Sequence, residues 1–600
     1  MRHIFFLHII LLVTFNAFSQ QKELNLADEY FTQGEYAKAE TKYEALSSKN
    51  QNIPLIYQNY LTSLKNLSKL DEAQKFVKKT IKLFPENPIY KVDLYLLMKE
   101  QKDGKAEKYI NSVFHEVRSN PAQVDQVHEH LMNFGEVQKS VDLLLEARTS
   151  SSSKSEYAIQ LSKAYMLLGK KELMVEEMLT YLMENPHQLD PVKNNFQNYL
   201  EKKEDFALLE NRLYEMVQKN PDNIVINELL LWINIQNKNF RQAFLQAKAI
   251  DKKGKLNGAK LNEVGKIALD NKDYEAAIKF YQYVNDEIKT GPYYSMARRM
   301  MIYSKEELVK NTYPVDQQKI TSLIQDYKNL IKDFGRINQS FEATRSMALL
   351  YGLYLDRKDT AIVLLQSILQ EPAADLKLKS NAKISLADIF LLSEEPWEAS
   401  LLYSQVEKDM KEDQIGHEAK LKNAKLAYYN GEFELAQSHL DILKMATTRE
   451  IANDAMDLSI LIQDNSALDT SYAALQEYAA IDLLLFQNKH EEALKRLDSM
   501  LIKFPGHTLT DEIYWLQASV YKKNGSYEES VKKLDKILAQ YKEGIFGDEA
   551  MYTKALILEE NLTREDEAMD IYKEFLFVYP GSIYVAEARK RYRLLRGDKL

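Results

Sequence analysis

A small residue recurs at a nearly constant interval through the first half of the chain. The successive intervals are 34, 33, 34, 34, 35, 34 and 34 residues. A regular period of about 20–50 residues is typical of stacked helical units, each covering the apolar face of the next. The period therefore predicts an elongated repeat fold. We call the residues of this series marker residues, and they are Ala39, Ala73, Ala106, Ser140, Met174, Leu209, Ala243 and Ala277.

Each interval reads as two helices, A and B, joined by a tight turn. Around the first marker, Tyr30 lies on the expected helix A, Gly34 in the turn and Tyr43 on helix B. A small marker on helix B lets the two backbones approach closely. Met174 and Leu209 are large for such a crossing. Nevertheless, a proline that would end helix B lies twelve residues after each of them. Pro186 follows Met174 and Pro221 follows Leu209 at this distance, just as Pro85 follows Ala73.

The interval changes after Ala277. The next marker, Ala361, lies 84 residues later, and the following intervals are 37 or 38 residues apart from one gap of 57. The segment at 291–345 is interpreted either as a junction that changes the direction of the superhelix or as two degenerate repeats with long helices. The later markers are Ala361, Ala399, Ala436, Ala493, Ser530 and Ala568.

The sequence thus predicts four segments. Residues 1–19 read as a signal peptide, and residues 20–290 as an N-terminal array with a period of about 34 residues. Residues 291–345 form the junction. Residues 346–600 form a C-terminal array with a 37–38-residue period, an extra helix near 448–464 and a basic capping helix at 583–597.

The hairpin pattern resembles the tetratricopeptide repeat (TPR), which implies an all-α superhelical solenoid, here in two arrays. Residues 478–597 are similar to the TPR modules of TolA-binding coordinator proteins and of outer-membrane assembly lipoproteins, although this chain is longer and has no cysteine for a lipid anchor. The C-terminal third also resembles long exported TPR proteins of Bacteroidota. The residues that carry the first likeness are Ala550, Ala555, Ala568, Tyr572, Phe575, Pro580 and Ala588.

The first residues have the composition of an export signal. Arg2 precedes an apolar run at 4–15, and Ala17 and Ser19 flank a small-x-small cleavage site. The apolar run is shorter than the ~20 residues that a membrane-spanning helix needs. We expect cleavage and a periplasmic protein without a transmembrane span; an uncleaved anchor, secretion and surface association are the alternatives.

The sequence contains no constellation that predicts catalysis or a cofactor. It has no GxGxxG, P-loop, HExxH or GxSxG pattern, and it has no cysteine. His128 and His130 would point about 200° apart on a helix, so they predict no metal site. The net charge of −9, with both signs interleaved, argues against nucleic acid as a partner.

Two candidate interaction sites remain. The TPR resemblance implies a concave peptide groove lined from helix A, here by Tyr478, Trp515, Ser519 and Lys522, although Trp515 could instead pack between hairpins. The other site is the basic closing helix, which reads either as a polar cap or as a docking element for an acidic partner or anionic headgroups. Its cations are Arg589, Lys590, Arg591, Arg593 and Arg596.

The predicted function is a non-enzymatic periplasmic scaffold. It would hold proteins of a cell-envelope complex for outer-membrane assembly, secretion or transport. The alternative is a soluble accessory subunit that recruits exported cargo or an enzyme through its concave groove. Both readings expect protein partners, and peripheral membrane association stays open.

Overall fold

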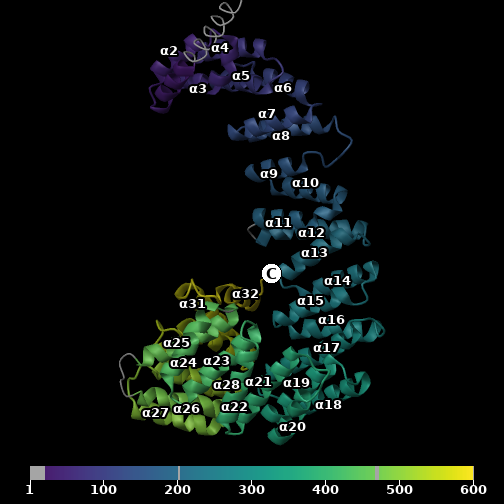
Figure 1. Ribbon diagram of the computed structural model, residues 1–600, viewed down its shortest axis with the longest axis vertical. Helices are drawn as coiled ribbons and strands as arrows, with labels where there is room; N and C mark the ends of the chain where they lie inside the picture. The colour runs from purple at the N-terminus through teal and green to yellow at the C-terminus, as the bar shows by residue number, and fades with distance from the viewer. Residues whose placement is uncertain (1–20, 201–202, 447, 467–471, 599–600) are drawn as a thin grey trace, which may run out of the picture. The chain divides into compact units, whose positions relative to one another are not determined.

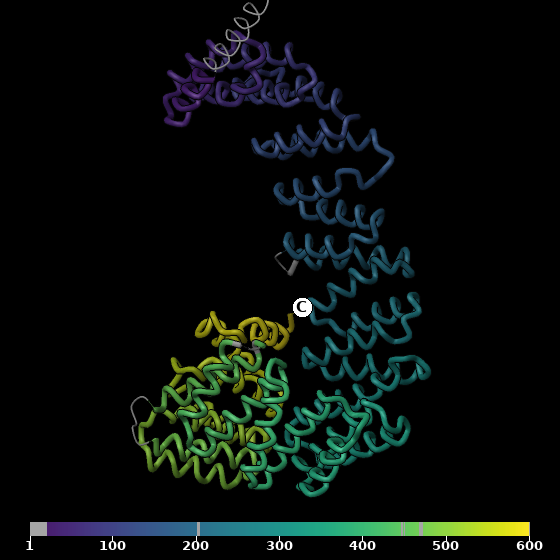
Figure 2. Tube along the Cα trace, in the orientation of Figure 1, coloured from purple at the N-terminus to yellow at the C-terminus, as the bar shows by residue number. Residues whose placement is uncertain are grey.

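The structure is a computed structural model that describes residues 21–200, 203–446, 448–466 and 472–598 (Figure 1). The predicted signal peptide at 1–19 lies outside the described residues. Every regular element within them is a helix. The chain divides into two compact units, Met1–Ile233 and Asn234–Leu600. Successive helices of each unit lie side by side in chain order (Figure 2).

The first unit begins with a helix at 21–32. Its further helices are α2 (Tyr36–Leu46), η1 (Asn50–Asn52), α3 (Ile53–Asn66), α4 (Leu70–Leu83), α5 (Pro88–Glu100), α6 (Ala106–Val117), α7 (Pro121–Asn133), α8 (Val137–Arg148), α9 (Ala158–Leu167), α10 (Lys171–Glu184), η2 (Pro186–Gln188), α11 (Leu189–Tyr199), α12 (Lys203–Lys219) and α13 (Ile224–Gln236), which crosses the unit boundary.

The second unit continues with α14 (Phe240–Gly254), α15 (Ala259–Asp270), α16 (Tyr274–Glu287), α17 (Tyr294–Lys310), α18 (Gln317–Phe334), α19 (Asn338–Tyr354), α20 (Lys358–Leu369), α21 (Leu376–Leu392), α22 (Pro396–Asp409), α23 (Gln414–Tyr429), α24 (Phe433–Ala446), α25 (Arg449–Ser466), α26 (Ala473–Phe486), α27 (His490–Lys503), α28 (Thr510–Lys523), α29 (Tyr527–Gln540), α30 (Gly547–Glu560), α31 (Glu565–Val578) and α32 (Val585–Leu595).

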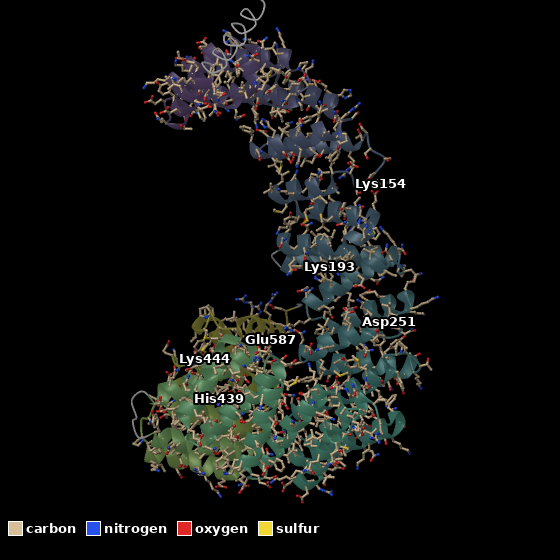
Figure 3. All side chains as sticks on the ribbon, viewed as in Figure 1. Lys154, Lys193, Asp251, His439, Lys444 and Glu587 are labelled. Atoms are coloured by element: carbon tan, nitrogen blue, oxygen red, sulfur yellow. The ribbon has the colours of Figure 1, made fainter. Side chains whose placement is uncertain are left out.

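Short polar side chains cap many of these helices. The Asn87 side chain accepts from the backbone N–H of Ile89, with Pro88 at the first helical position of α5. Asp251, labelled in Figure 3, is buried and accepts from the backbone N–H groups of Gly258 and Lys260 at 2.9 and 3.0 Å. Such bonds satisfy backbone groups that the ends of helices leave without a partner.

All of the marker residues are buried. Ala106 retains 6% of its surface, Ser530 retains 1%, and the others retain none, including the large Met174 and Leu209. Consecutive helices pack against each other from α2 to α11 and from α14 to α32. The predicted fold class, an all-α TPR-type solenoid, is therefore confirmed.

The stack continues through residues 291–345 without a break. Helix α17 packs on α16 and α18, and α18 packs on α19. These three helices have 17, 18 and 17 residues. The boundary between the compact units falls instead inside α13. Because the units and the repeat lengths divide the chain at different places, the two-array division stays a prediction.

A buried tyrosine often lies one helical turn after the marker. The Tyr43, Tyr403 and Tyr572 hydroxyls donate to Asp28, Asp388 and Glu559 on the paired helix A, at 2.6, 2.5 and 2.8 Å. Burial raises the pKa of each of these tyrosines. These tyrosines fill the core and also tie the two helices of a hairpin together.

The second unit folds back on itself through its turns. Turns that follow α26 and α28 meet turns that follow α17, α19 and α21, which lie 95–214 residues earlier. We call these the turn contacts. They are the bonds from Tyr527 Oη to the Tyr313 carbonyl (2.7 Å), from Asn488 to the Leu353 carbonyl (3.0 Å) and from Gln487 to the Leu391 carbonyl (3.3 Å), and the Lys489–Glu394 ion pair (2.5 Å).

Polar side chains meet on the inner side of this closed part. Lys422 on α23 donates to both oxygens of Asp388 on α21, at 2.9 and 3.0 Å. The Tyr428 hydroxyl donates to Asp482 on α26 at 3.3 Å. Burial raises the pKa of Asp482 to about 6, against the hydrogen bond from Tyr428 and the nearby charge of Lys425. Helices α21, α23 and α26 thus share a polar inner side.

We predict that Tyr403→Phe lowers the free energy of unfolding by about 1–3 kcal/mol, because it removes a bond to a carboxylate. Tyr281→Phe is the matched control. Tyr281 is equally buried at the equivalent position, but its hydroxyl has no hydrogen-bond partner among the described residues. Its replacement should be neutral or slightly stabilising. Urea unfolding followed by circular dichroism compares the two, and equal losses would contradict the prediction.

We also predict that Asp482→Asn stabilises the protein near pH 7 and has little effect near pH 4. The folded state raises the carboxyl pKa from 3.8 to about 6. It therefore binds more protons than the unfolded state between these values, and stability falls as the pH rises through them. Because the side chain is partly accessible, the gain above pH 6 should be about 1–3 kcal/mol.

The measurement for Asp482 is the melting temperature from pH 4 to pH 8. Asp464→Asn, on an exposed position of α25, is the control and should give a difference from the parent that does not change with pH. A destabilisation by Asp482→Asn that is constant over this range would show that the carboxylate is needed in its charged form, contrary to the prediction.

Candidate functional site

The four residues predicted for a concave groove lie in different environments. Tyr478 is buried, with 6% of its surface exposed, and burial raises its pKa. Trp515 is half-buried and stacks on Phe546, just before α30, with ring centroids 5.4 Å apart and planes at 14°. Ser519 and Lys522 are partly accessible, and burial lowers the pKa of Lys522. Trp515 therefore packs against the next hairpin, and peptide binding by these residues stays a prediction.

Most cations of the closing helix α32 have acidic partners. Arg591 forms ion pairs with Glu559 and Glu560 on α30, at 2.9 and 2.8 Å. Arg593 and Arg596 both pair with Asp598. The Arg591 ion pairs fasten the last helix to α30, and all of these contacts partly neutralise its charge.

The remaining two cations of this helix face the solvent. Lys590 is exposed and lies 3.8 Å from Glu587, and Arg589 is exposed with no ion pair among the described residues. A docking role for the closing helix stays a prediction, and these two residues are its accessible part.

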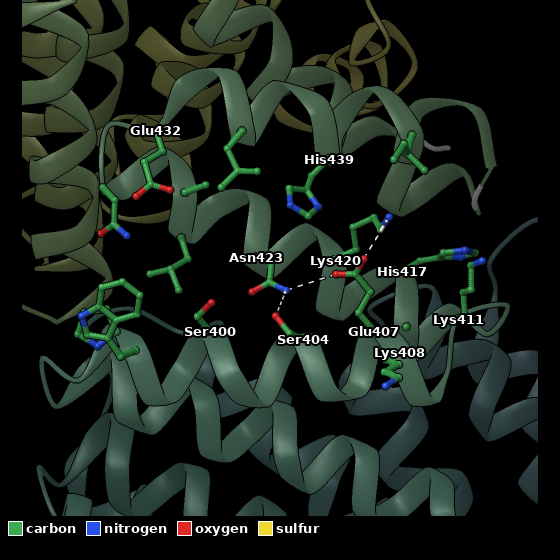
Figure 4. Close-up of a pocket in the computed structure, with 18 of the residues that line it drawn as sticks. Ser400, Ser404, Glu407, Lys408, Lys411, His417, Lys420, Asn423, Glu432 and His439 are labelled. Atoms are coloured by element: carbon green, nitrogen blue, oxygen red, sulfur yellow. Dashed lines mark hydrogen bonds and ion pairs between the residues drawn. The ribbon is translucent and has the colours of Figure 1, made fainter.

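A groove opens on the other side of the stack, between α22 and α24. Both are B helices, and α23 forms the floor (Figure 4). We call this the outer groove, and its volume is about 970 Å³. The floor residues follow one stripe of α23, at spacings of four, three and four: Gly416, Lys420, Asn423 and Ala427. The opposite stripe, with Lys422, faces the inner side.

Hydrogen bonds link the floor of the outer groove to one wall. Asn423 donates to Ser404 Oγ at 3.2 Å and to Glu407 Oε2 at 3.3 Å. Lys420 pairs with Glu407 at 3.1 Å. These contacts gather polar side chains in the middle of the groove, as Figure 4 shows. His439 faces them from α24, and burial lowers its pKa below the ordinary value.

Large apolar side chains line the groove and remain exposed. Trp397 retains 87% of its surface, Leu435 retains 48% and Ile442 retains 54%. Leu401 and Met445 on the same two helices are 55% and 91% exposed. An apolar surface of this kind, bordered by polar residues, is typical of a binding site.

None of the site residues predicted from the sequence lies in the outer groove. One signal was present: Trp397 directly follows Pro396, at the start of a B helix where the repeat pattern requires no aromatic residue. The groove itself was not predictable from one repeat, because it depends on the distance between two successive B helices.

The two histidines of the HEH segment have separate partners. His128 Nδ1 lies 2.6 Å from the Ser140 hydroxyl, and His130 Nε2 lies 2.7 Å from Asp93. The described residues hold no group of three or more His, Asp or Glu side chains that could bind a metal ion. Within the described ranges, no helix is long and apolar enough to cross a membrane.

Comparisons with known proteins give likenesses of fold only. No protein-family model matches the chain, and no curated protein matches it. A solved structure of Naa15/Naa10 bound to HypK-THB is similar at 14% identity, over 96% of each chain, with a TM-score of 0.28.

Two further structures are similar to the same degree. A tetratricopeptide repeat protein from Parabacteroides merdae ATCC 43184 has 10% identity and a TM-score of 0.25, over 48% of this chain and 94% of its own. The APC/C hetero-tetramer Cut9–Hcn1 has 13% identity and a TM-score of 0.25, over 89% and 96%. None of these likenesses says what this chain binds.

Proposed function

We propose that the chain is a non-catalytic scaffold of the periplasm that holds proteins of a cell-envelope complex. The observation that carries the proposal is the apolar surface of α22 and α24, where Trp397, Leu401, Leu435, Ile442 and Met445 are all about half exposed or more. The periplasmic location depends on the predicted signal peptide and on the resemblance to exported TPR proteins, and both stay predictions.

The size of this surface supports protein binding. Covering one large apolar side chain contributes about 1.5–3 kcal/mol. Several such residues on neighbouring helices therefore supply a substantial part of the binding free energy of a protein complex. Left exposed to solvent, the same side chains contribute nothing to the stability of the fold. Aromatic residues such as Trp397 are enriched among the residues that dominate binding.

A scaffold role predicts that partner retention depends on Trp397. We expect Trp397→Ser to reduce the partners recovered from detergent-solubilised envelopes at least tenfold, as about 1.4 kcal/mol or more of binding is lost. Leu167→Ser, at a 55% exposed position of α9, is the matched control. Circular dichroism should show unchanged helix content for both variants.

The same purification tests the two sites predicted from the sequence. Trp515→Ala with Lys522→Ala removes the concave groove residues, and Arg589→Glu with Lys590→Glu reverses the accessible charges of α32 without touching Arg591. Loss of partners only in the first pair would place binding in the concave groove. Salt-dependent loss only in the second would place it on the closing helix.

The identity of the recovered proteins separates the scaffold from the alternative function. Outer-membrane barrel proteins support the scaffold, whereas exported cargo or a secreted enzyme supports a recruiting subunit. Recovery of no protein above background from any variant, the parent included, would contradict both.

A further inference from the structure

The outer groove lies between two successive B helices of the second unit, α22 and α24. Some successive B helices touch each other, as α6 touches α8 and α14 touches α16. Between α22 and α24 there is instead an open volume of about 970 Å³. A helix about 10 Å wide fills roughly 400 Å³ per turn, so the groove has room for about two turns of an added helix.

From this shape and its lining we propose that the outer groove binds an amphipathic α-helix of a partner protein, oriented with an acidic C-terminal end over Lys408 and Lys411. The inference rests on the proposed scaffold function, which it deepens by naming the chemistry of the partner.

The backbone of the lining favours a helical partner over an extended one. The walls and most of the floor come from α22, α23 and α24, whose interior N–H and C=O groups bond within their own helices. An extended peptide would find few backbone partners there and would bury its own polar groups unpaired. A helix satisfies its backbone internally and needs only side-chain contacts.

The apolar contacts have the spacing of a helical stripe. Leu435 and Ile442 lie seven residues apart on α24, and Trp397 lines the groove from α22. A partner helix with apolar residues at i, i+4 and i+7 would cover these side chains. The polar middle of the groove, with Asn423 and Ser400, favours one polar residue within that stripe.

The charges differ between the two ends of the groove. At one end Lys408 and Lys411 make no ion pair within the described residues. The nearby charge of Glu412 offsets one of these two positive charges. Lys420 is already paired with Glu407. At the other end the lining carries Glu432. A helix has a partial negative charge at its C-terminus and a partial positive charge at its N-terminus. The charges therefore favour the orientation that we propose.

The test uses a display library of 15-residue helices as the probe. Leucine is fixed at i, i+4 and i+7, and the exposed positions vary between Glu and Lys. Selection is on the full-length protein. We expect enriched helices that carry Glu near the C-terminal end and bind Trp397→Ser at least tenfold more weakly, while Leu167→Ser binds them like the parent.

Charge reversal tests the orientation. With Lys408→Glu and Lys411→Glu, the selection should favour Lys near the C-terminal end of the helix. Lys532→Glu with Lys536→Glu, on α29, is the control and should leave the selection unchanged. The proposal is overturned if no helix is enriched, if enriched helices bind the Trp397 variant equally, or if reversal leaves the charge preference as it was.

A second copy of the chain is the competing occupant. Sedimentation of the parent and of Trp397→Ser distinguishes it, since dimerisation lost in the variant would assign the groove to self-association and overturn the proposal. The experiments distinguish failure of the proposed scaffold function from failure of the proposed helix-binding site. Enriched helices without envelope partners would count against the scaffold function alone. Envelope partners without any enriched helix would count against the helix site alone.

Discussion

At each marker residue, helix B crosses helix A with little or no accessible surface between them. This close approach sets the spacing of the two helices in every hairpin. It also places the residue one turn later against helix A, where Tyr43, Tyr403 and Tyr572 find a carboxylate. The crossing is tolerant, because Met174 and Leu209 occupy it fully buried. Stacking of such hairpins then leaves two sides with different chemistry, an inner one formed by A helices and an outer one formed by B helices.

The curvature of the helix stack in the second unit makes its inner and outer sides different. Its turn contacts join segments up to 214 residues apart and bring α23 against α26. In the second unit, A helices α19, α21 and α23 approach one another on the inner side, whereas the B helices α22 and α24 behind them are spread apart. Between α22 and α24 the spreading exposes α23 and forms the outer groove. The closed inner side, with Asp388, Lys422 and Asp482, and the open outer side are thus two results of one curvature.

Local patterns were sufficient to predict the helices and their pairing. Marker spacing, turn glycines and prolines act within about 40 residues, and the burial of the marker residues agrees with them. The turn contacts and the outer groove depend on the curvature that several repeats produce together. No single repeat encodes that curvature. Tyr478 illustrates the difference: one repeat suggests a groove position, whereas the approach of α23 to α26 buries it. Trp397 was missed because it lies outside the repeating positions.

Helix α23 shows why the candidate site leaves a weak trace in the sequence. Lys422 and Tyr428 serve the inner side, whereas Lys420 and Asn423 serve the groove. A helix that is polar in two opposite directions has no single apolar face, so its periodicity indicates neither surface. Because both surfaces share this helix, a shift of α23 would alter both of them. A helix bound between α22 and α24 would hold them apart, and by maintaining that separation it would favour the curvature that keeps the inner turn contacts closed.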